Sequence, residues 1–292
     1  MKCYIDAGNT RIKWQIGPKA VMQSLAWSEW DVGLDLWVDR LNTRAQGKPV
    51  VDRFIIASVV PPARQTQLAE TITQHFPHVP VQWIQSRARC CGIQFAYPDM
   101  TQFGVDRFCA LVAARRRYPR QAVIVINAGT AVTVDYLRTD GVHEGGVIMP
   151  SMAAMAAGLN QLAPNLAPFW TQGPQSGAGG MGEGKMLATN TAGALQLGCR
   201  WMLASALAQI VEALSDGAKQ ELAESIAPAT VVSGGGATVL MPLLSPTAHW
   251  MPDLVMEGIR LAARQPLPTK TKKTSEKDQG VINLLPSDNN CD

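Results

Sequence analysis

The chain has 292 residues, of which 47% are hydrophobic and 17% are charged, and its formal net charge is +3. This composition suits a globular protein with a sizeable core and excludes an intrinsically disordered chain. The basic residues form no long stripe, so nucleic acid is not expected as a partner, whereas a small anionic substrate is compatible with the charge.

Apolar runs and turn residues predict the first elements of the chain. Residues 1–16 contain two short apolar strands around Gly8, which is the pattern of a β-hairpin. Residues 54–60 have the composition of a buried strand, and residues 63–75 have helical spacing. The chain is therefore expected to begin with mixed α/β structure.

A longer helix and a second hairpin are expected further along. Residues 103–117 have apolar side chains at helical spacing, with Asp106 in the first turn and three arginines in the last, an order that complements the helix dipole. A β-branched run at 122–126 is followed by a turn and a second strand at 132–136. From residue 265 the composition shifts to Pro, Lys, Thr and Ser, which predicts a flexible tail over 265–292.

Two segments of the chain resemble each other. Residues 3–14 (CYIDAGNTRIKW) and residues 124–135 (IVINAGTAVTVD) each have an apolar strand, an Asp or Asn, Ala-Gly and a second strand, and they start 121 residues apart. This repeat predicts duplicated halves that face each other. The alternative is a chance match between two ordinary Ala-Gly hairpins.

The residues in these two hairpins suit phosphate binding. A glycine turn lets backbone N–H groups approach phosphate oxygens that a Cβ atom would keep away. Asn9, Thr10 and Thr130 add neutral donors, and Lys13 can place a cation near the β- or γ-phosphate. Asp6, at the end of the first strand, is suited to hold Mg²⁺ directly or through water. In the alternative reading these are plain turns, and Asp6 only bonds its own backbone.

A second group of polar residues lies at the expected start of the helix at 103–117. Arg107 can pair with a substrate carboxylate, Asp106 can accept the proton of an attacking hydroxyl, and Tyr97 lies shortly before them. A carboxylate of ordinary pKa, about 3.9, suffices because phosphoryl transfer depends mainly on positioning. The alternative is that Asp106 only complements the helix dipole and Arg107 forms a surface ion pair.

The cysteines and the longest apolar stretch bear on where in the cell the protein is expected. Six cysteines occur without a C-x-x-C motif, and the adjacent pair Cys90 and Cys91 lacks metal-ligand spacing. Without a recognisable signal peptide, we expect reduced thiols and a cytoplasmic protein. Residues 192–214 are long enough to span a bilayer, but Arg200 and Glu212 within them favour a packed helix, so no membrane is expected.

Taken together and in order, the motifs resemble those of type III pantothenate kinases over about residues 1–264. They are Asp6-Ala7-Gly8-Asn9-Thr10-Arg11-Ile12-Lys13, Gly104-Val105-Asp106-Arg107, Gly129-Thr130-Ala131 with Thr133, Gly145-Gly146-Val147-Ile148-Met149-Pro150, Asn190-Thr191 and Ser233-Gly234-Gly235. Six motifs in one order are far more specific than any single motif.

The resemblance implies an α/β fold with two related actin-like (ribonuclease H-like) domains and a nucleotide cleft between them. The N-terminal half would span residues 1–115 and the C-terminal half residues 116–264, followed by the flexible tail at 265–292. The implied reaction transfers the γ-phosphate of ATP, bound with Mg²⁺, to pantothenate, giving 4′-phosphopantothenate as the first step of coenzyme A biosynthesis.

The resemblance also implies roles for individual residues. Those that would bind ATP are Asp6 (also the Mg²⁺ ligand), Ala7, Gly8, Asn9, Thr10, Arg11, Ile12, Lys13 and Thr130. Those that would bind pantothenate are Tyr97, Gly104, Val105, Asp106 and Arg107, with Asp106 as the proton acceptor. Thr191 would reach the pantothenate of the neighbouring subunit, which implies a homodimer.

Two residues depart from the family pattern. Asn127 stands where family members commonly carry an Asp associated with a monovalent cation, K⁺ or NH₄⁺. Because Asn keeps a carbonyl oxygen but loses the charge, we expect cation binding at reduced affinity. Ser151 stands where a glycine usually follows the proline.

Two other functions stay open at this stage. A nucleotide-binding accessory or regulatory protein could keep this fold without turnover, and Asn127 is the residue that favours it. A kinase or phosphatase that acts on another small molecule is the second, although Arg107 makes an acidic acceptor preferable to a neutral sugar.

Overall fold

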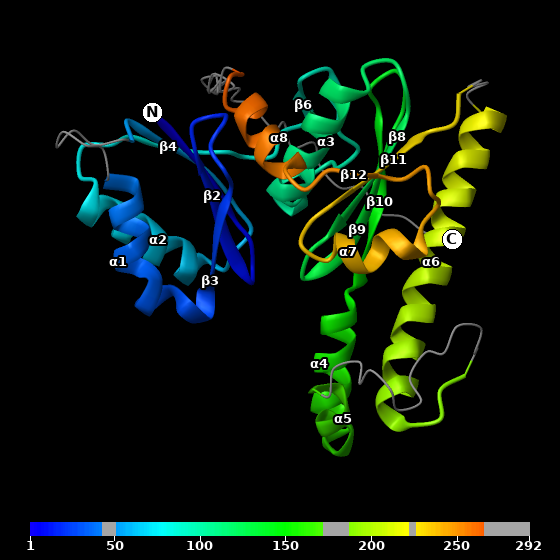
Figure 1. Cartoon of the computed structure of the whole chain (residues 1–292). Helices are drawn as coiled ribbons and strands as arrows, with labels where there is room; N and C mark the ends of the chain where they lie inside the picture. Colours follow the sequence, from blue (N-terminus) through cyan, green and yellow to red (C-terminus); the bar gives the residue numbers. More distant parts are fainter. Residues whose placement is uncertain (43–50, 172–186, 222–225, 266–292) are drawn as a thin grey trace, which may run out of the picture.

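The fold is taken from a computed structural model and is described for residues 1–42, 51–171, 187–221 and 226–265 (Figure 1). Two five-stranded sheets with helices on both sides make up most of this part of the chain. A small two-stranded hairpin and helices that pack between the sheets join them.

The first sheet is built from the N-terminal part of the chain. Its strands are β1 (Lys2–Ala7), β2 (Arg11–Ile16), β3 (Gln23–Ala26), β4 (Arg53–Ser58) and β5 (Val81–Trp83), in the order β3-β2-β1-β4-β5. Its helices are η1 (Trp27–Glu29), α1 (Trp30–Asn42) and α2 (Pro62–His75). β1 pairs antiparallel with β2 and parallel with β4, so it is an inner strand. Its two faces belong to different cores, with Tyr4 on one and Cys3 and Ile5 on the other, which explains its nearly continuous apolar sequence.

The second sheet repeats this arrangement. Its strands are β8 (Val123–Ala128), β9 (Ala131–Leu137), β10 (His143–Pro150), β11 (Ala229–Ser233) and β12 (His249–Trp250), in the order β10-β9-β8-β11-β12. β8 pairs antiparallel with β9 and parallel with β11, as β1 does with β2 and β4. The repeated strand order confirms the duplication that the two similar segments predicted.

The remaining elements connect or flank the sheets. Between them in sequence come β6 (Arg89–Cys90), β7 (Ile93–Gln94), η2 (Met100–Gln102) and α3 (Val105–Arg117). After β10 come α4 (Met152–Leu162), η3 (Pro164–Leu166), α5 (Ala167–Thr171), α6 (Thr191–Glu221), α7 (Ala237–Leu240), η4 (Met241–Leu243) and α8 (Leu254–Ala262). Ser151 is the N-cap of α4, because its Oγ accepts a hydrogen bond from the N–H of Ala154 at 3.2 Å.

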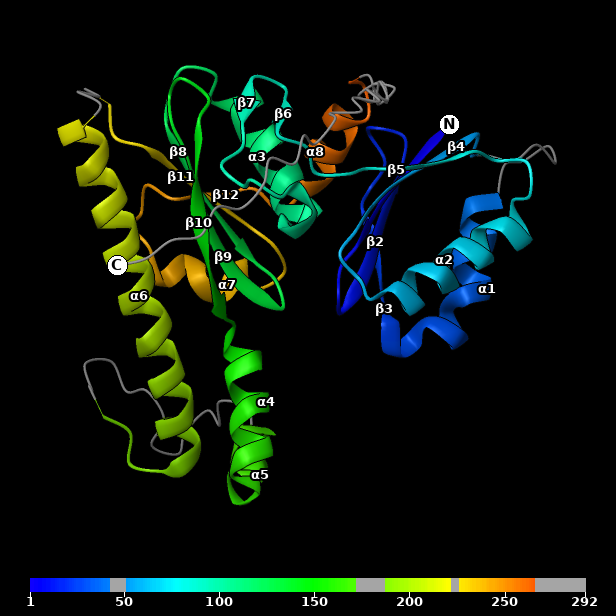
Figure 2. The ribbon, with the colours of Figure 1, turned by 180° about the vertical axis from the view of Figure 1, so that it is seen from behind.

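Three clusters of buried side chains hold the layers together. α1 and α2 cover the outer face of the first sheet, where Trp30 and Trp37 are buried, and α6 and α7 cover the outer face of the second (Figures 1 and 2). α3 and α8 lie between the sheets, and Phe108 and Ile259 join residues of both sheets in one shared core. Fully burying a side chain such as Phe108 stabilises the fold by roughly 1.5–3 kcal/mol.

The expected elements are confirmed. The two hairpins appear as β1–β2 and β8–β9, the strand at 54–60 as β4, and the two helices as α2 and α3. The tail prediction falls on residues that, from 266 onward, lie outside the described part of the chain. The division near residue 115 stays a prediction; α8, late in the sequence, contacts β1 of the first sheet.

The contact between α3 and α8 generates a test of the shared core. A Cβ atom at Gly258 of α8 would overlap the carbonyl group of Cys109 in α3. We expect Gly258→Ala to lower the free energy of unfolding by about 1–3 kcal/mol, because the two helices must separate. Urea denaturation measures this.

The matched control is Gly158→Ala in the middle of α4, where a Cβ atom would meet no neighbouring atom. This variant should be as stable as the wild type or more so, because alanine is the better helix former. Equal stability changes at the two glycines would contradict the close helix packing.

Candidate functional site

The two hairpin turns face each other. The hydroxyls of Thr10, in the β1–β2 turn, and Thr130, in the β8–β9 turn, lie 2.7 Å apart although 120 residues separate them in sequence. Each turn is closed by a backbone hydrogen bond, from the N–H of Gly8 to the carbonyl of Arg11 and from the N–H of Gly129 to the carbonyl of Ala131. The structure therefore brings the two predicted phosphate-binding turns to one place.

Asp6 lies behind the first turn on the face of β1 that is directed towards α3. Its neighbour two residues earlier, Tyr4, belongs to the shared core between the sheets, and alternate residues of a strand share a face. Asp6 is 8% exposed, and the Nζ of Lys13 lies 3.5 Å from its Oδ2. Burial raises the pKa of Asp6, Lys13 lowers it and Asp106 raises it. A cation would therefore stabilise this carboxylate, so the residues present fit Mg²⁺.

Asp106 occupies the first turn of α3 and is half-buried. One carboxylate oxygen, Oδ1, accepts the backbone N–H of Arg107 at 2.8 Å. Burial raises the pKa of Asp106, and the hydrogen bond from Arg107 opposes that change. Because the negative charge of Asp106 raises the pKa of Asp6, the acceptor group predicted on α3 lies near the predicted metal ligand on β1. Such a carboxylate can receive a proton.

Arg107 is buried in a network that sequence reasoning did not predict. Its Nε and Nη2 donate to the two carboxylate oxygens of Asp135 on β9, at 2.9 and 2.7 Å. Its Nη1 donates to the hydroxyl of Tyr97 at 3.2 Å. The Nε2 of His143 lies 3.0 Å from Asp135, and the His143 ring stacks on that of Tyr97. The alternative of a surface ion pair for Arg107 is wrong, because its partner is buried.

A signal for Asp135 was available in the sequence. Thr133, Asp135 and Leu137 are every second residue of β9, so their side chains share one face of the strand. Leu137 belongs to the shared core, so this is the face directed towards α3. Strand alternation could therefore have placed Asp135 opposite Arg107. His143 gave no such signal, because its partners come from three different segments.

Asn127, the residue before the last of β8, lies among buried hydroxyls. It is paired in register with Thr133 on β9 and with Ser233 on β11, so the three side chains share a face. The hydroxyl oxygens of Thr133 and Ser233 are buried and have no hydrogen-bond partner among the described residues. Buried polar groups are costly unless they are bonded, so this group fits a polar ligand such as a phosphate or a cation.

The Ser233-Gly234-Gly235 motif lies beside Asn127. Gly234 has a φ of +94°, and a Cβ atom there would meet the carbonyl of Ala128 and, at 2.9 Å, the Oδ1 of Asn127. Only glycine allows this turn to approach the end of β8 so closely. The motif therefore belongs to the same site as the second hairpin turn.

Other predicted site residues lie elsewhere. The side chains of Ala7 and Ile12 are buried in the core on the outer face of the first sheet, so only their backbone can reach a nucleotide. The guanidinium of Arg11 donates to the hydroxyl of Ser24 on β3 at 3.1 Å. Thr191 is exposed at the start of α6, which begins at the end remote from the two sheets (Figures 1 and 2).

Comparisons with known proteins identify relatives. Residues 3–213 match the family model described as type III pantothenate kinase. The type III pantothenate kinase of Stenotrophomonas maltophilia (strain K279a) is 37% identical over 212 residues, 72% of this chain and 78% of the relative. That of Alkalilimnicola ehrlichii is 33% identical over 272 residues, 89% and 97% of the two chains.

A solved structure is similar in fold. The crystal structure of a Campylobacter jejuni protein described as a Baf family transcriptional activator has a TM-score of 0.52 and 15% sequence identity, and the likeness covers 89% of this chain and 96% of that one. At this identity the likeness concerns the fold alone. It gives the accessory-protein alternative no support.

The network around Arg107 generates a stability test. We expect Asp135→Asn to lower the free energy of unfolding by roughly 3–5 kcal/mol, because it leaves a buried guanidinium without its counter-ion. Glu257→Gln is the control, since the Arg117–Glu257 ion pair is half exposed and should contribute at most about 1 kcal/mol. Urea denaturation measures the free energy of unfolding of both variants. Equal losses in the two variants would contradict the buried network.

Proposed function

The chain belongs to the type III pantothenate kinase family, and we propose that it transfers the γ-phosphate of ATP to pantothenate, giving 4′-phosphopantothenate. This is the first step of coenzyme A biosynthesis. The observation that carries the proposal is the meeting of the Thr10 and Thr130 turns near the half-buried carboxylate of Asp106. The two halves of the chain, residues 1–115 and 116–264, would close on the nucleotide.

The nucleotide side of the site is assigned to the two turns. Backbone N–H groups of residues 8–10, with the hydroxyls of Thr10 and Thr130, would contact the phosphates, and Lys13 would add a positive charge. Asp6 would hold Mg²⁺, which when bound neutralises charge on the phosphate oxygens. The support is that Asp6 is a buried carboxylate, and the ammonium group of Lys13 lies 3.5 Å from it.

The acceptor side is assigned to the start of α3. Asp106 would accept the proton of the pantothenate hydroxyl, while Gly104 and Val105 would contribute backbone groups beside it. Because Asp135 engages Nε and Nη2 of Arg107, we assign the pantothenate carboxylate to Nη1, next to the hydroxyl of Tyr97. The buried ion pair keeps the guanidinium in a fixed orientation for that contact.

A monovalent cation, K⁺ or NH₄⁺, is proposed at Asn127. Its side-chain carbonyl, together with the unpartnered hydroxyls of Thr133 and Ser233, offers neutral oxygen ligands. Since no carboxylate is among these three, we expect the affinity to be lower than in family members that carry Asp there.

We also propose a cytoplasmic homodimer in which α6 faces a second copy of the chain. By length and composition α6 could cross a membrane, but one such helix is weak evidence for a membrane span. Only 17% of the apolar window of α6 is buried. Trp201 and Met202 are 47% and 63% exposed on this helix. A contiguous exposed apolar surface is typical of an interaction site. The remote start of α6 also agrees with Thr191 serving the neighbouring subunit.

The role of Asp106 predicts the effect of Asp106→Asn. We expect kcat to fall at least about 100-fold, because the variant loses the proton acceptor, while ATP affinity stays unchanged. A coupled assay of pantothenate-dependent ADP release measures the first, and calorimetric titration with ATP measures the second. The control is Asp31→Asn in the exposed first turn of α1. A near-native kcat for Asp106→Asn would contradict the role.

The pH profile gives an independent readout of the same group. The pKa of Asp106 is raised by burial, and the base form is the ionised carboxylate. Activity should therefore be lost as the pH falls through this raised pKa, which lies above the ordinary value of about 3.9. A wild-type profile that stays flat down to the ordinary range would count against Asp106.

The dimer proposal predicts the effect of Trp201→Glu. A charge at this exposed apolar position should give a monomer, because burying it in an interface is costly, and kcat/KM should fall as the Thr191 contact is lost. Light scattering with size-exclusion chromatography measures the mass. Val32→Glu is the control, since Val32 is 90% exposed on α1. A monomeric wild type would overturn the proposal.

A further inference from the structure

Cys90 and Cys91 lie at a tight turn outside the proposed active site. The β6–β7 hairpin has a two-residue loop, Cys91 and Gly92, with φ of +51° and +77°. Two positive φ values define the type I′ hairpin turn, in which Asn or Gly usually takes the first position. Among the described residues Cys91 is the sole non-glycine residue with positive φ. The turn thus holds a cysteine in an unusual backbone conformation.

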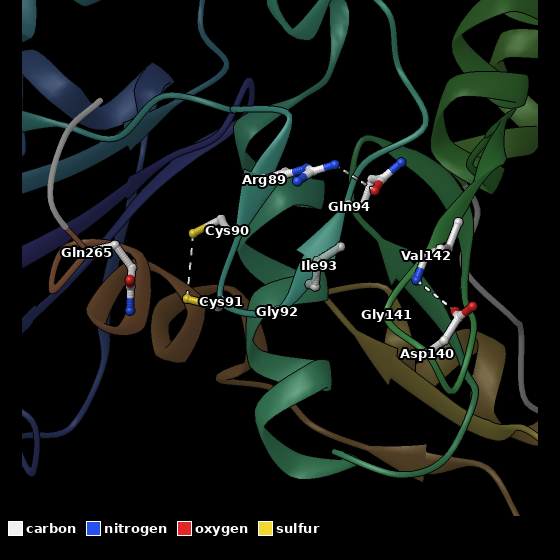
Figure 3. A pocket seen from close by; sticks show the side chains of 10 residues that line it. All are labelled: Arg89, Cys90, Cys91, Gly92, Ile93, Gln94, Asp140, Gly141, Val142 and Gln265. Carbon is white, nitrogen blue, oxygen red and sulfur yellow. Dashed lines mark hydrogen bonds between the residues drawn. The ribbon is translucent and has the colours of Figure 1, made fainter. Parts of the chain in front are cut away.

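The turn brings the two sulfur atoms together. The Sγ atoms of Cys90 and Cys91 lie 3.5 Å apart and point towards one another (Figure 3). They line a cavity of about 460 Å³ with Arg89, Gln94 and other residues of this hairpin and of the β9–β10 loop. Cys90 is buried and Cys91 is partly exposed, so a ligand would enter from the side of Cys91.

The pair is chemically activated. The hydrogen bond from the Cys90 thiol lowers the pKa of Cys91 to about 7, and the positive charge of Arg87 acts in the same direction. The same interaction raises the pKa of Cys90. Cys91 is therefore the more readily ionised thiol of the pair, and the thiolate is the nucleophilic form.

The surroundings limit the kind of ligand. Over the described residues no group of three His, Cys, Asp or Glu side chains could hold a metal ion, so a closed four-ligand zinc site is excluded there. Two adjacent sulfur ligands instead suit a soft metal or metalloid atom that needs only two thiolates from the protein. The remaining described cysteines, Cys3, Cys109 and Cys199, are buried and form no such pair.

We propose that Cys90 and Cys91 form a chelating dithiol site for a thiophilic trivalent arsenical. In the reaction with an organic arsenic(III) oxide, each sulfur forms one As–S bond, and the two thiol protons leave with the oxide oxygen as one water molecule. The oxidation states of arsenic and sulfur do not change. The site is independent of the proposed phosphoryl transfer, because it lies on a separate hairpin.

The test uses the full-length wild-type protein with phenylarsine oxide. We expect one arsenical per chain by non-denaturing mass spectrometry, with the loss of two titratable thiols. The adduct should be removed by 2,3-dimercaptopropanol but not by the same amount of a monothiol, because a chelate is displaced only by another chelate. Absence of an adduct, or removal by the monothiol, would overturn the proposal.

Single variants assign the adduct to the pair. Cys91→Ser and Cys90→Ser should each bind the arsenical at least about 100-fold more weakly, because one thiolate cannot chelate. Cys199→Ser and Cys291→Ser should bind as the wild type does. Thermal unfolding by circular dichroism checks that each variant is folded. If Cys90→Ser unfolds, Cys91→Ala serves as the second variant, because Cys91 is the more exposed of the two residues. Wild-type affinity in folded Cys91→Ser or Cys91→Ala would refute the site.

Discussion

The buried ion pair between Arg107 and Asp135 joins α3 to the second sheet, and the geometry of the site depends on it. A bidentate guanidinium–carboxylate contact fixes orientation as well as distance, and inside a protein it is sensitive to the loss of either partner. Asp106 precedes Arg107 on the same helical turn, so its carboxylate is fixed relative to β9. Tyr97 and His143 extend this connection to the segment before α3. The acceptor side of the site is therefore one rigid group.

The nucleotide side follows from the duplication. Asp6 on β1 and Asn127 on β8 occupy equivalent positions in the two repeats, both on the face directed towards α3. The repeats have diverged in charge, since one keeps a carboxylate and the other an amide. Two carboxylates would repel a polyphosphate more strongly than one, so the amide reduces the negative charge at the site. An Asp in place of Asn127 would restore that negative charge, and a bound cation would then offset it.

The sequence predicted elements whose signals are local. Gly8 and Gly129 mark turns between apolar strands, and the similarity of residues 3–14 to 124–135 predicted two facing halves. The contact between Thr10 and Thr130 agrees with that prediction. The helix at 103–117 followed from its spacing, and Asp106 in its first turn followed from the same pattern.

Features that depend on packing between distant segments were not predicted. The partner of Arg107 lies 28 residues away on another strand, and a guanidinium near a helix start has the same local pattern whether it is exposed or buried. Cys90 and Cys91 lack metal-ligand spacing, and adjacency in sequence does not by itself place two sulfur atoms in contact. A turn with two positive φ values brings adjacent sulfurs together, which no spacing rule describes. Backbone conformation supplied the missing information.

The position of α8 has a consequence for how the chain acquires its structure during synthesis. This helix is formed by residues 254–262, yet it covers the inner face of the sheet whose strands leave the ribosome first. Until residues 254–262 have been translated, β1 and β4 expose on that face apolar side chains that α8 covers in the folded protein. The first half is therefore a poor candidate for folding early and alone, and long-range contacts of this kind slow folding. Nascent chains that stall before residue 254 should depend on chaperones more than chains that stall after residue 265.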